Sequence, residues 1–440
     1  MIRESLYNGF SQVTRGDPHR KRRTTERGRM LMMAIVICAA LGIDTDQSLV
    51  YQVFALLLSV MIVSRLSLRL PAPRLQLRRV LPTTATAGET FDYSVQITNL
   101  DAEDQLEISV VDNPHARIPD LKTFLTTPEP DEEKRNAWDR FVGFYRYLWL
   151  QRLMTGIIIA PSEAHRVYAG STTHVTLTAE ALRRGIVHFR STEVRYPDPF
   201  GLNLKVLNED NPDQLTILPQ HYPMVLSQDP SAGRIYQPGG HHSSWSRGES
   251  HEFVALRDYQ VGDSPRKIHW PSTARRGTFV VREYQDEYLT RHLLLLDLAT
   301  EDNAKLEAAI SAAASLLMAS KDTEQAIDLL FMTDHSTLVS GGDHREATLH
   351  QLEALACVNA STSDTVQLLD AAIHHGRASS GFSLISCSWS IEIRQSWQSL
   401  SASMAPLRLL LIGSEPVDDL PAIASIIHPE TIAEDLRVVS

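Results

Sequence analysis

The sequence predicts a multidomain protein in which an N-terminal transmembrane helical hairpin precedes a β-sandwich and a C-terminal α/β domain. Two apolar runs lie within the first 63 residues, apolar and polar residues alternate in segments between 75 and 194, and predicted strands and helices alternate from residue 292. The 440 residues accommodate two or three domains. The predicted boundaries are 1–29 for a basic cytoplasmic tail, 30–66 for the hairpin, 70–216 for the sandwich, 217–290 for a charged and aromatic segment, and 291–440 for the α/β domain.

The apolar runs, 30–43 and 49–63, are separated by a polar turn that contains Asp44 and Asp46. Each is short for a membrane span, which needs about 20 apolar residues, unless flanking residues extend it. The second run and the lack of a small-x-small cleavage site argue against a signal peptide, and a buried soluble helix pair is the alternative. Arginines crowd both flanks, so the positive-inside rule places both flanks and the soluble domains in the cytoplasm. Left alone, residues 1–29 would be disordered.

The β-sandwich is predicted from segments in which every second residue is apolar. These segments are 91–99, 106–113, 172–178 and 185–194. Short strands at such spacing, with turn residues between them, are typical of an immunoglobulin-like sandwich.

An insertion near 130–155 interrupts this pattern. Its aromatic and apolar residues fall at helical spacing: Trp138, Phe141, Val142, Tyr145, Leu148 and Trp149. The predicted helix is amphipathic. Two interpretations stay open, because such a stripe can lie in the membrane interface or pack against the sandwich.

The segment 248–283 interleaves charged residues with large apolar ones, which a solvated charge run does not do. A strand over 252–259, a turn at 261–265 and a second strand over 278–284 are predicted, with 267–276 crossing back between them. Asp258 or Asp263 would accept hydrogen bonds from Arg257, Arg266 or Arg275. This network either fixes the register of the segment or presents a docking surface, and a catalytic site is a third possibility.

In the last domain, continuous apolar strands alternate with helices. The strands are expected at 292–297, 326–332, 337–339, 382–387 and 407–412, and the helices at 303–320, 346–357, 364–375 and 392–403. Such a pattern predicts a mostly parallel sheet that is covered on both faces. Ligands of these sheets bind at the carboxyl ends of the strands, where Asp297 is placed.

These segments together resemble the bacterial domain-of-unknown-function family 58. The resemblance rests on 183–185 (Arg-Arg-Gly), 198–202 (Asp-Pro-Phe-Gly-Leu), 217–219 (Ile-Leu-Pro) and a long signature in the charged segment. The signature residues are Glu252, Phe253, Leu256, Arg257, Asp258, Tyr259, Gly262, Asp263, Arg266, Ile268, His269, Trp270, Ala274 and Arg275. The resemblance implies a protein of the bacterial inner membrane with a von Willebrand factor A-like C-terminal domain. It also implies a MoxR-type AAA+ ATPase as partner.

Domains similar to von Willebrand factor A bind a divalent cation through an Asp-x-Ser-x-Ser loop, a distant threonine and a later aspartate. Asp297 matches the first position, but Ala299 and Glu301 replace the serines. Thr362 is the candidate distant threonine, and Ser386 and Cys387 stand where Thr-Asp is expected. A hard cation needs several oxygen ligands, so the metal site is expected to be degenerate. Mg²⁺ held by Asp297 and Glu301 is the alternative, and capping of the next helix by Asp297 is another.

The composition and the motifs narrow the range of functions that the chain could have. A formal net charge of −11 argues against nucleic acid as a partner, and the three cysteines have no paired or metal-ligand spacing. No nucleophile elbow, phosphate loop or zinc motif occurs, so we expect no enzyme. The expected function is a membrane-anchored, cytoplasm-facing interaction module, an adaptor or chaperone-like partner of the ATPase. The alternatives are a metal-dependent hydrolase at Asp297 and a structural scaffold of a membrane complex.

Overall fold

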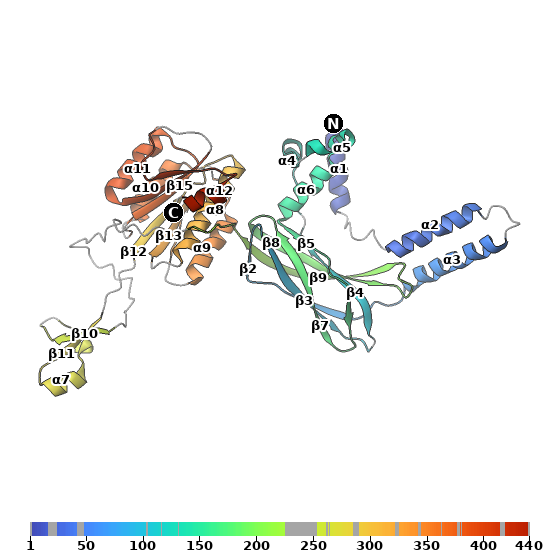
Figure 1. The fold of residues 1–440 in the computed structure, drawn as a ribbon, viewed down its shortest axis with the longest axis horizontal. Helices are drawn as coiled ribbons and strands as arrows, with labels where there is room; N and C mark the ends of the chain where they lie inside the picture. Colours follow the sequence, from blue (N-terminus) through green and yellow to red (C-terminus); the bar gives the residue numbers. More distant parts are fainter. Residues whose placement is uncertain are drawn as a thin grey trace. The chain divides into compact units, whose positions relative to one another are not determined.

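The protein has several β-sheets in two units, with helices at the N-terminus (Figure 1). The first unit comprises residues 1–220 and 352–358, and the second comprises 221–351 and 359–440. The computed structural model describes residues 2–15, 24–41, 48–102, 104–115, 117–130, 132–224, 253–260, 263, 265–284, 290–321, 325–341, 345–361, 363–375, 379, 381–413 and 419–438.

Two sheets share one hydrophobic core in the first unit. One has the order β1 (Leu75–Val80), β3 (Thr90–Asn99), β7 (Thr172–Ala181) and β5 (Ile157–Ile159). The other has the order β2 (Thr84–Thr86), β9 (Leu204–Leu218), β8 (Gly185–Pro197), β4 (Gln105–Pro114) and β6 (His165–Val167). Alternate residues of both sheets, such as Val95 and Val194, point into the core and are fully buried. The alternation in the sequence predicted β3, β4, β7 and β8, whereas β2, β5, β6 and β9 were not predicted.

An ion pair lies buried inside this unit. Arg79, on β1, donates two hydrogen bonds to the carboxylate of Asp112, at 2.7 and 2.5 Å, and neither side chain is exposed. Tyr93 and Thr192 donate to the same carboxylate, and the guanidinium lies 4.5 Å from the ring centroid of Phe189. Arg79 is one of the arginines behind the second apolar run, which the sequence assigned to a basic membrane flank. That assignment is wrong, because β1 directs this side chain into the core.

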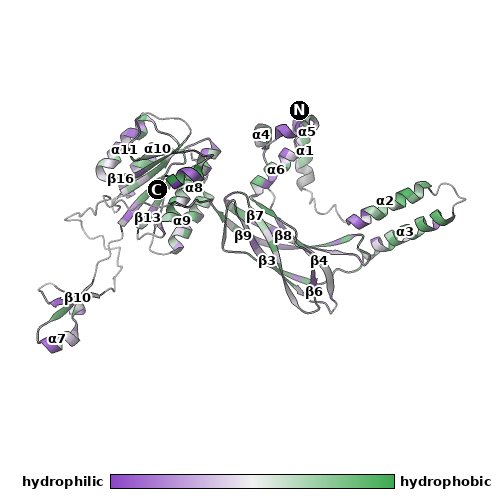
Figure 2. Cartoon of the chain, viewed as in Figure 1, coloured by the Kyte–Doolittle hydropathy of each residue, from purple (hydrophilic) through white to green (hydrophobic). Residues whose placement is uncertain are grey.

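Three helices precede the sheets: α1 (Ile2–Arg15), α2 (Glu26–Leu41) and α3 (Ser48–Ser67). Helices α2 and α3 lie side by side, and Figure 2 shows both as largely hydrophobic. Within the described part of the chain, only α3 is long and apolar enough to cross a membrane, over Leu49–Ser67. The predicted transmembrane hairpin therefore stays a prediction, because α2, with 16 residues, is shorter than a full span.

The insertion after β4 forms three α-helices and a short 3-10 turn. They are α4 (Leu121–Thr126), the turn Glu132–Lys134, α5 (Ala137–Val142) and α6 (Phe144–Thr155). Tyr147 of α6 and Phe124 of α4 are buried in one cluster. The ring of Tyr7, in α1, contacts both of them, and the ring of Phe10, also in α1, contacts Tyr147. The N-terminal segment therefore folds onto the insertion, which differs from the disorder expected of the segment alone.

The second unit contains a six-stranded sheet. Its order is β14 (Ser336–Val339), β13 (Gln325–Met332), β12 (Thr290–Leu296), β15 (Gly381–Ser386), β16 (Ala405–Ile412) and β17 (Ala424–Ile427). All neighbours are parallel except β13 and β14. Its helices include α8 (Asn303–Ser320), α10 (Thr365–His375), α11 (Ile391–Ser403) and α12 (Ile432–Val438), together with the first part of α9 (Arg345–Cys357), whose residues from Leu352 onward belong to the first unit.

Both faces of the central strand β12 are buried. Leu293 and Leu295 share a cluster with α10 and α11, and the alternate residues Leu294 and Leu296 are fully buried on the opposite face, where α8 packs on the strands. The predicted parallel sheet with two covered faces is thus present in this unit. The sequence indicated each element up to β16 and missed β17 and α12.

Candidate interaction site in the signature module

The signature residues lie on a small substructure, the signature module, which we define as the described residues between 253 and 284. Strands β10 (Phe253–Asp258) and β11 (Val280–Tyr284) pair antiparallel, and α7 (Trp270–Arg276) lies between them in sequence. The two strands were predicted, but the crossing segment is helical. Pro271 in its first turn and Gly277, whose φ is 72°, are the residue types that begin and end a helix.

A bidentate ion pair holds the module together. Both terminal nitrogens of Arg257 donate to Asp263, each at 2.7 Å, and the backbone N–H of Gln260 donates to the same carboxylate at 2.9 Å. This is one of the pairs expected from the sequence. Asp258 lies 3.9 Å from Arg276 rather than beside Arg266 or Arg275, and both partners are largely exposed. An exposed pair of this kind contributes at most about 1 kcal/mol.

His269 has a structural environment. Its backbone N–H donates to the carbonyl of Val280 at 2.8 Å, and its Nδ1 lies 2.7 Å from the hydroxyl of Ser272. The preceding Ile268 forms an isolated bridge with Val281 of β11. These contacts attach the start of α7 to β11, while Ala274 is exposed on α7. Of the other signature residues, Glu252 and Gly262 lie outside the described residues.

Four large apolar side chains remain exposed on the module. This aromatic patch consists of Leu256, Tyr259, Trp270 and Phe279. The ring of Phe279 makes edge-type contacts with both Tyr259 and Trp270, with centroids 6.0 and 6.4 Å apart. Trp270 is 62% exposed, although a tryptophan normally buries most of its surface. The exposed arginines of the module are Arg266, Arg275, Arg276 and Arg282. Aromatic residues beside arginine are typical of protein interfaces.

The Arg-Arg-Gly motif lies in the first unit. Arg184 is buried, and its guanidinium donates to the carbonyls of Leu355 at 3.0 Å and Val358 at 2.5 Å, both of which belong to the same unit. A cation at these carbonyls satisfies acceptors that the end of a helix leaves free.

The edge of the sheet at Asp297 has few groups for a cation. Asp297 is buried, and its carboxylate accepts hydrogen bonds from the N–H of Ala299 at 2.9 Å and from the hydroxyls of Thr365 and Ser386 at 2.8 and 2.6 Å. Thr365 therefore occupies the place for which the sequence suggested Thr362, a residue outside the described part of the chain. Glu301 is exposed and follows Asp297 by four positions. Among the described residues, no cluster of three His, Cys, Asp or Glu side chains could hold a metal.

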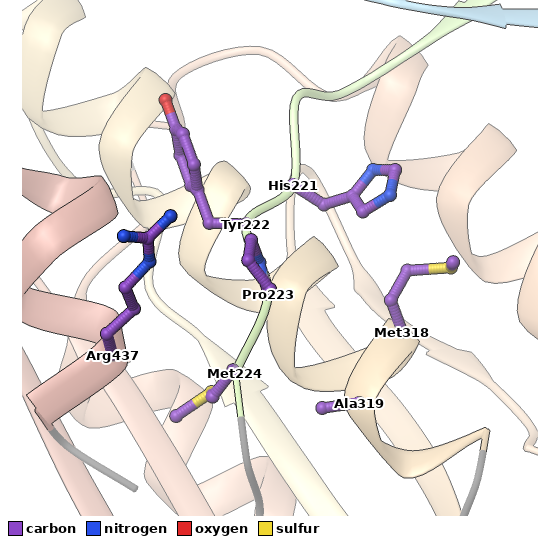
Figure 3. A pocket seen from close by; sticks show the side chains of 7 residues that line it. All are labelled: His221, Tyr222, Pro223, Met224, Met318, Ala319 and Arg437. Carbon is purple, nitrogen blue, oxygen red and sulfur yellow. The ribbon is translucent and has the colours of Figure 1, made fainter.

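A cavity of about 560 Å³ lies beside α8 (Figure 3). Its lining consists of His221, Tyr222, Pro223, Met224, Met318, Ala319 and Arg437. The backbone N–H of Tyr222 donates to the hydroxyl of Ser315, at 2.9 Å, which ties the segment after the Ile-Leu-Pro motif to α8. The lining combines the apolar side chains of Pro223, Met224, Met318 and Ala319 with the polar groups of His221, Tyr222 and Arg437.

The comparisons with known proteins concern the signature module and the beginning of the last domain. Residues 255–385 match the model of the family "Protein of unknown function DUF58". "Uncharacterized protein YeaD" from Bacillus subtilis is 29% identical over 147 residues, which are 32% of this chain and 35% of that protein. The chain thus matches about a third of the relative's length. The resemblance predicted from the signature is confirmed by these matches.

Likenesses among solved structures are weak. An aerotolerance-related membrane protein from Bacteroides fragilis has 9% identity and a TM-score of 0.22, with 34% of this chain and 87% of that chain covered. A PapD-like domain of human CEP192 has 13% identity and a TM-score of 0.19, with 33% and 88% covered. Scores this low support no inference about fold or function.

Proposed function

From the premise that residues 255–385 belong to the family "Protein of unknown function DUF58", we propose that this chain is a membrane-anchored, cytoplasm-facing protein-interaction module. Its signature module docks a MoxR-type AAA+ ATPase, and the chain serves that ATPase as an adaptor or chaperone-like partner. The observation that carries the docking surface is the aromatic patch, in which Trp270 and Phe279 are exposed on a module braced by Arg257 and Asp263. The identity of the ATPase is an expectation from the family resemblance.

The physical argument for docking is that the module's charged residues and its aromatic residues have different roles. Arg257 and Asp263 bind each other and fix the loop, so their bonds are used within the module. The aromatic patch contributes ring contacts within the module, between Phe279 and both Tyr259 and Trp270, but its side chains also remain exposed to solvent. Interface hot spots are enriched in tryptophan, tyrosine and arginine, and the patch has all three within reach.

Helix α3 supports the proposed anchorage of the chain in a membrane. This helix is apolar and mostly exposed to its surroundings, and its final turn contains Arg65, with Arg69 and Arg74 after it. A bacterial inner membrane with the arginines on the cytoplasmic side satisfies the positive-inside rule and places both units in the cytoplasm. The finer fold assignments belong to this proposal: an immunoglobulin-like first unit and a von Willebrand factor A-like second unit, whose parallel strand order supports it.

A catalytic role receives less support. The carboxylate of Asp297 already accepts three hydrogen bonds from Ala299, Thr365 and Ser386, and the described residues contain no cluster of three His, Cys, Asp or Glu side chains that could hold a metal. A hydrolase that used Mg²⁺ would need these hydroxyls to turn their lone pairs toward the ion and more oxygen ligands to join them. We therefore propose a non-enzymatic function.

The test is a binding titration of the full chain, solubilised in detergent, against a purified MoxR-type ATPase from the same organism. Trp270→Ala and Phe279→Ala should each weaken binding by about thirtyfold or more, because truncation of a hot-spot residue costs about 2 kcal/mol or more. Trp138→Ala is the matched control, since Trp138 is 72% exposed and lies in the other unit. Its affinity should equal that of the wild type.

Two outcomes contradict the proposal. If the wild-type chain does not bind the ATPase, the adaptor function is contradicted and the scaffold alternative is left. Equal affinities for wild type, Trp270→Ala and Phe279→Ala place the docking surface elsewhere. Thermal melts of each variant establish that a loss of binding is not a loss of folding, and Arg257→Ala should lower both binding and melting temperature because it removes the brace.

A further inference from the structure

The turn between β8 and β9, residues 198–203, is built to a fixed shape. The Asp198 carboxylate accepts from the backbone N–H groups of Leu202 at 2.7 Å and Asn203 at 3.0 Å, and the Asp198 carbonyl accepts from Gly201 at 2.9 Å. Gly201 has a φ of 66°, which a residue with a side chain rarely adopts. Phe200, at the tip, is 47% exposed. We call this segment the membrane-proximal turn for the reasons that follow.

The start of α2 is bonded to this turn. Thr25 donates its backbone N–H to the carbonyl of Leu202 at 3.0 Å and its hydroxyl to the carbonyl of Gly201 at 2.7 Å. The same hydroxyl accepts from the N–H of Gly28 at 3.1 Å, as an N-cap does. Gly28 is buried, and an added Cβ would collide with the carbonyl oxygen of Leu202. The first turn of α2 thus touches the tip of the strand pair.

The end of α3 is bonded to the same turn. Asn203 donates its side-chain N–H to the hydroxyl of Ser64 at 2.5 Å, and both residues are fully buried. The Lys205 ammonium donates to the carbonyl of Leu70, just beyond the helix. The turn therefore holds the beginning of one apolar helix and the end of the other at one level.

That level coincides with the boundary of a bilayer. Helix α3 has 20 residues and measures about 30 Å, which equals the hydrocarbon thickness of a typical membrane. Ser64 lies three residues before its end, or about 4.5 Å along the axis. When α3 spans the membrane, Ser64 and the turn bound to it lie where acyl chains meet headgroups. Phe200, which is exposed at the tip of this turn, then lies near an interface that suits an aromatic ring.

The charges at this level are positive. Arg27 precedes Gly28, Arg65 follows Ser64, and Arg69 lies one turn further; all three are exposed. Arg29 is paired with Glu26, and both of those side chains are exposed as well. An excess of basic side chains around the ends of two apolar helices is complementary to phosphate groups that carry negative charge.

We propose that the membrane-proximal turn is a lipid-binding surface, in which Phe200 inserts at the boundary of the cytoplasmic leaflet and Arg27, Arg65 and Arg69 bind the headgroups of anionic phospholipids. This inference rests on the membrane anchorage proposed above. It adds that the first unit is seated on the leaflet by its own strand pair, rather than tethered through the helices alone.

The test uses a bimane label on the full chain in lipid vesicles, with Cys38, Cys357 and Cys387 replaced by alanine. Phe200→Cys carries the label, Pro199→Cys is a second site in the same turn, and Tyr168→Cys is the control because Tyr168 is exposed on another turn of the unit. Aqueous iodide should quench labels at 199 and 200 several-fold less than the label at 168. Circular dichroism melts show whether each labelled chain is folded.

The headgroup preference is measured with brominated lipids. At equal mole fractions, brominated phosphatidylglycerol should quench the label at 200 more strongly than brominated phosphatidylcholine. Arg27→Gln combined with Arg69→Gln should reduce this preference, by about fivefold for each arginine removed.

The outcomes separate the two proposals. A chain that does not float with the vesicles overturns the anchorage itself. A chain that floats while iodide quenches the label at 200 as strongly as the label at 168 overturns the lipid-binding turn alone. Equal quenching by the two brominated lipids in the wild type overturns the role of the arginines.

Discussion

The substitution Asp112→Asn removes the negative charge from the buried ion pair while keeping the size of the side chain. Arg79 then stays inside the core, with no exposed surface and no counter-charge, because β1 leaves it no route to solvent. The carboxylate also accepts from Tyr93 at 2.8 Å and Thr192 at 3.0 Å, and an amide offers one acceptor oxygen where there were two. Burial beside Asp112 raises the pKa of Tyr93. Its hydroxyl therefore stays protonated and cannot supply the negative charge that the substitution removes.

The expected cost is large. Breaking a buried ion pair by removing one partner costs about 3–5 kcal/mol. This corresponds to about a 10²- to 10⁴-fold increase in the equilibrium constant for opening of the first unit. Hydrogen exchange followed by mass spectrometry suits a chain with two units, because it reports on each segment separately. Peptides from β1, β3, β4 and β8 of the full chain in detergent should exchange faster by that factor, while peptides from β12 and β13 should keep their rates.

Asp92→Asn provides the matched control. Asp92 is exposed on the same strand as Tyr93 and accepts from Thr178 at 2.7 Å, a bond that an amide oxygen preserves. Its effect should stay within about twofold, since surface substitutions usually change stability by less than 0.5 kcal/mol. If Asp112→Asn changes exchange in the first unit by less than tenfold, the buried pair does not hold the two sheets together and the reasoning fails.

Two further predictions concern titratable groups. Burial, with Asp297 nearby, raises the pKa of Cys387 to about 12, whereas Cys357 is exposed. Iodoacetamide at pH 8 should therefore modify Cys357 first and Cys387 only after the second unit unfolds, as followed by mass spectrometry; equal rates would contradict this. Burial alone would raise the pKa of Glu132, but hydrogen bonds from Arg146, at 2.5 and 2.9 Å, and from the N–H of Glu129 outweigh it and lower the pKa. Because the folded-state pKa lies below the unfolded one, this stabilisation is complete above the unfolded pKa and is lost as pH falls through the folded value. Amide protection of α6, corrected for intrinsic rates, should fall in that acidic window in the wild type and change less in Glu132→Gln. The same pH dependence in both chains would show that another group is responsible.

Strands such as β3, β7 and β12 could be predicted because their burial pattern is local. In β3 and β7 every second residue is apolar, and in β12 a continuous apolar run indicates a strand buried on both faces. Each signal lies within the strand itself. The pairing of the strands sets the order and register of each sheet, and it does not change which residues face inward.

The missed elements have weaker or misleading local signals. Helix α7 has seven residues, too few for a helical period, so the interleaved charges and rings resembled an extended segment. Pro271 and Gly277 were the available signals. In the segment 1–29, the basic run at 20–29 obscured Tyr7 and Phe10 of α1, whose spacing of three places both rings on one helix face.

Partners that lie far apart in sequence could not be inferred at all. Arg79 resembled the arginines of a membrane flank, and nothing near it indicated Asp112, 33 residues later. Thr365 donates to Asp297 across 68 residues, and its position at the start of α10 gives no sign of that partner. Pairing of this kind depends on which strands and helices become neighbours.

Several charged residues of the family motifs have structural partners, and this decides how the docking hypothesis has to be tested. Arg184 binds the end of a helix, Asp198 shapes the turn at the apolar helices, and Asp263 holds Arg257. Replacing any of them removes a scaffold contact, so a loss of binding in such a variant has two explanations. The rings of Trp270 and Phe279 are exposed instead, and their removal leaves the hydrogen bonds of the module in place. Only the aromatic variants can therefore separate a docking surface from a folding requirement.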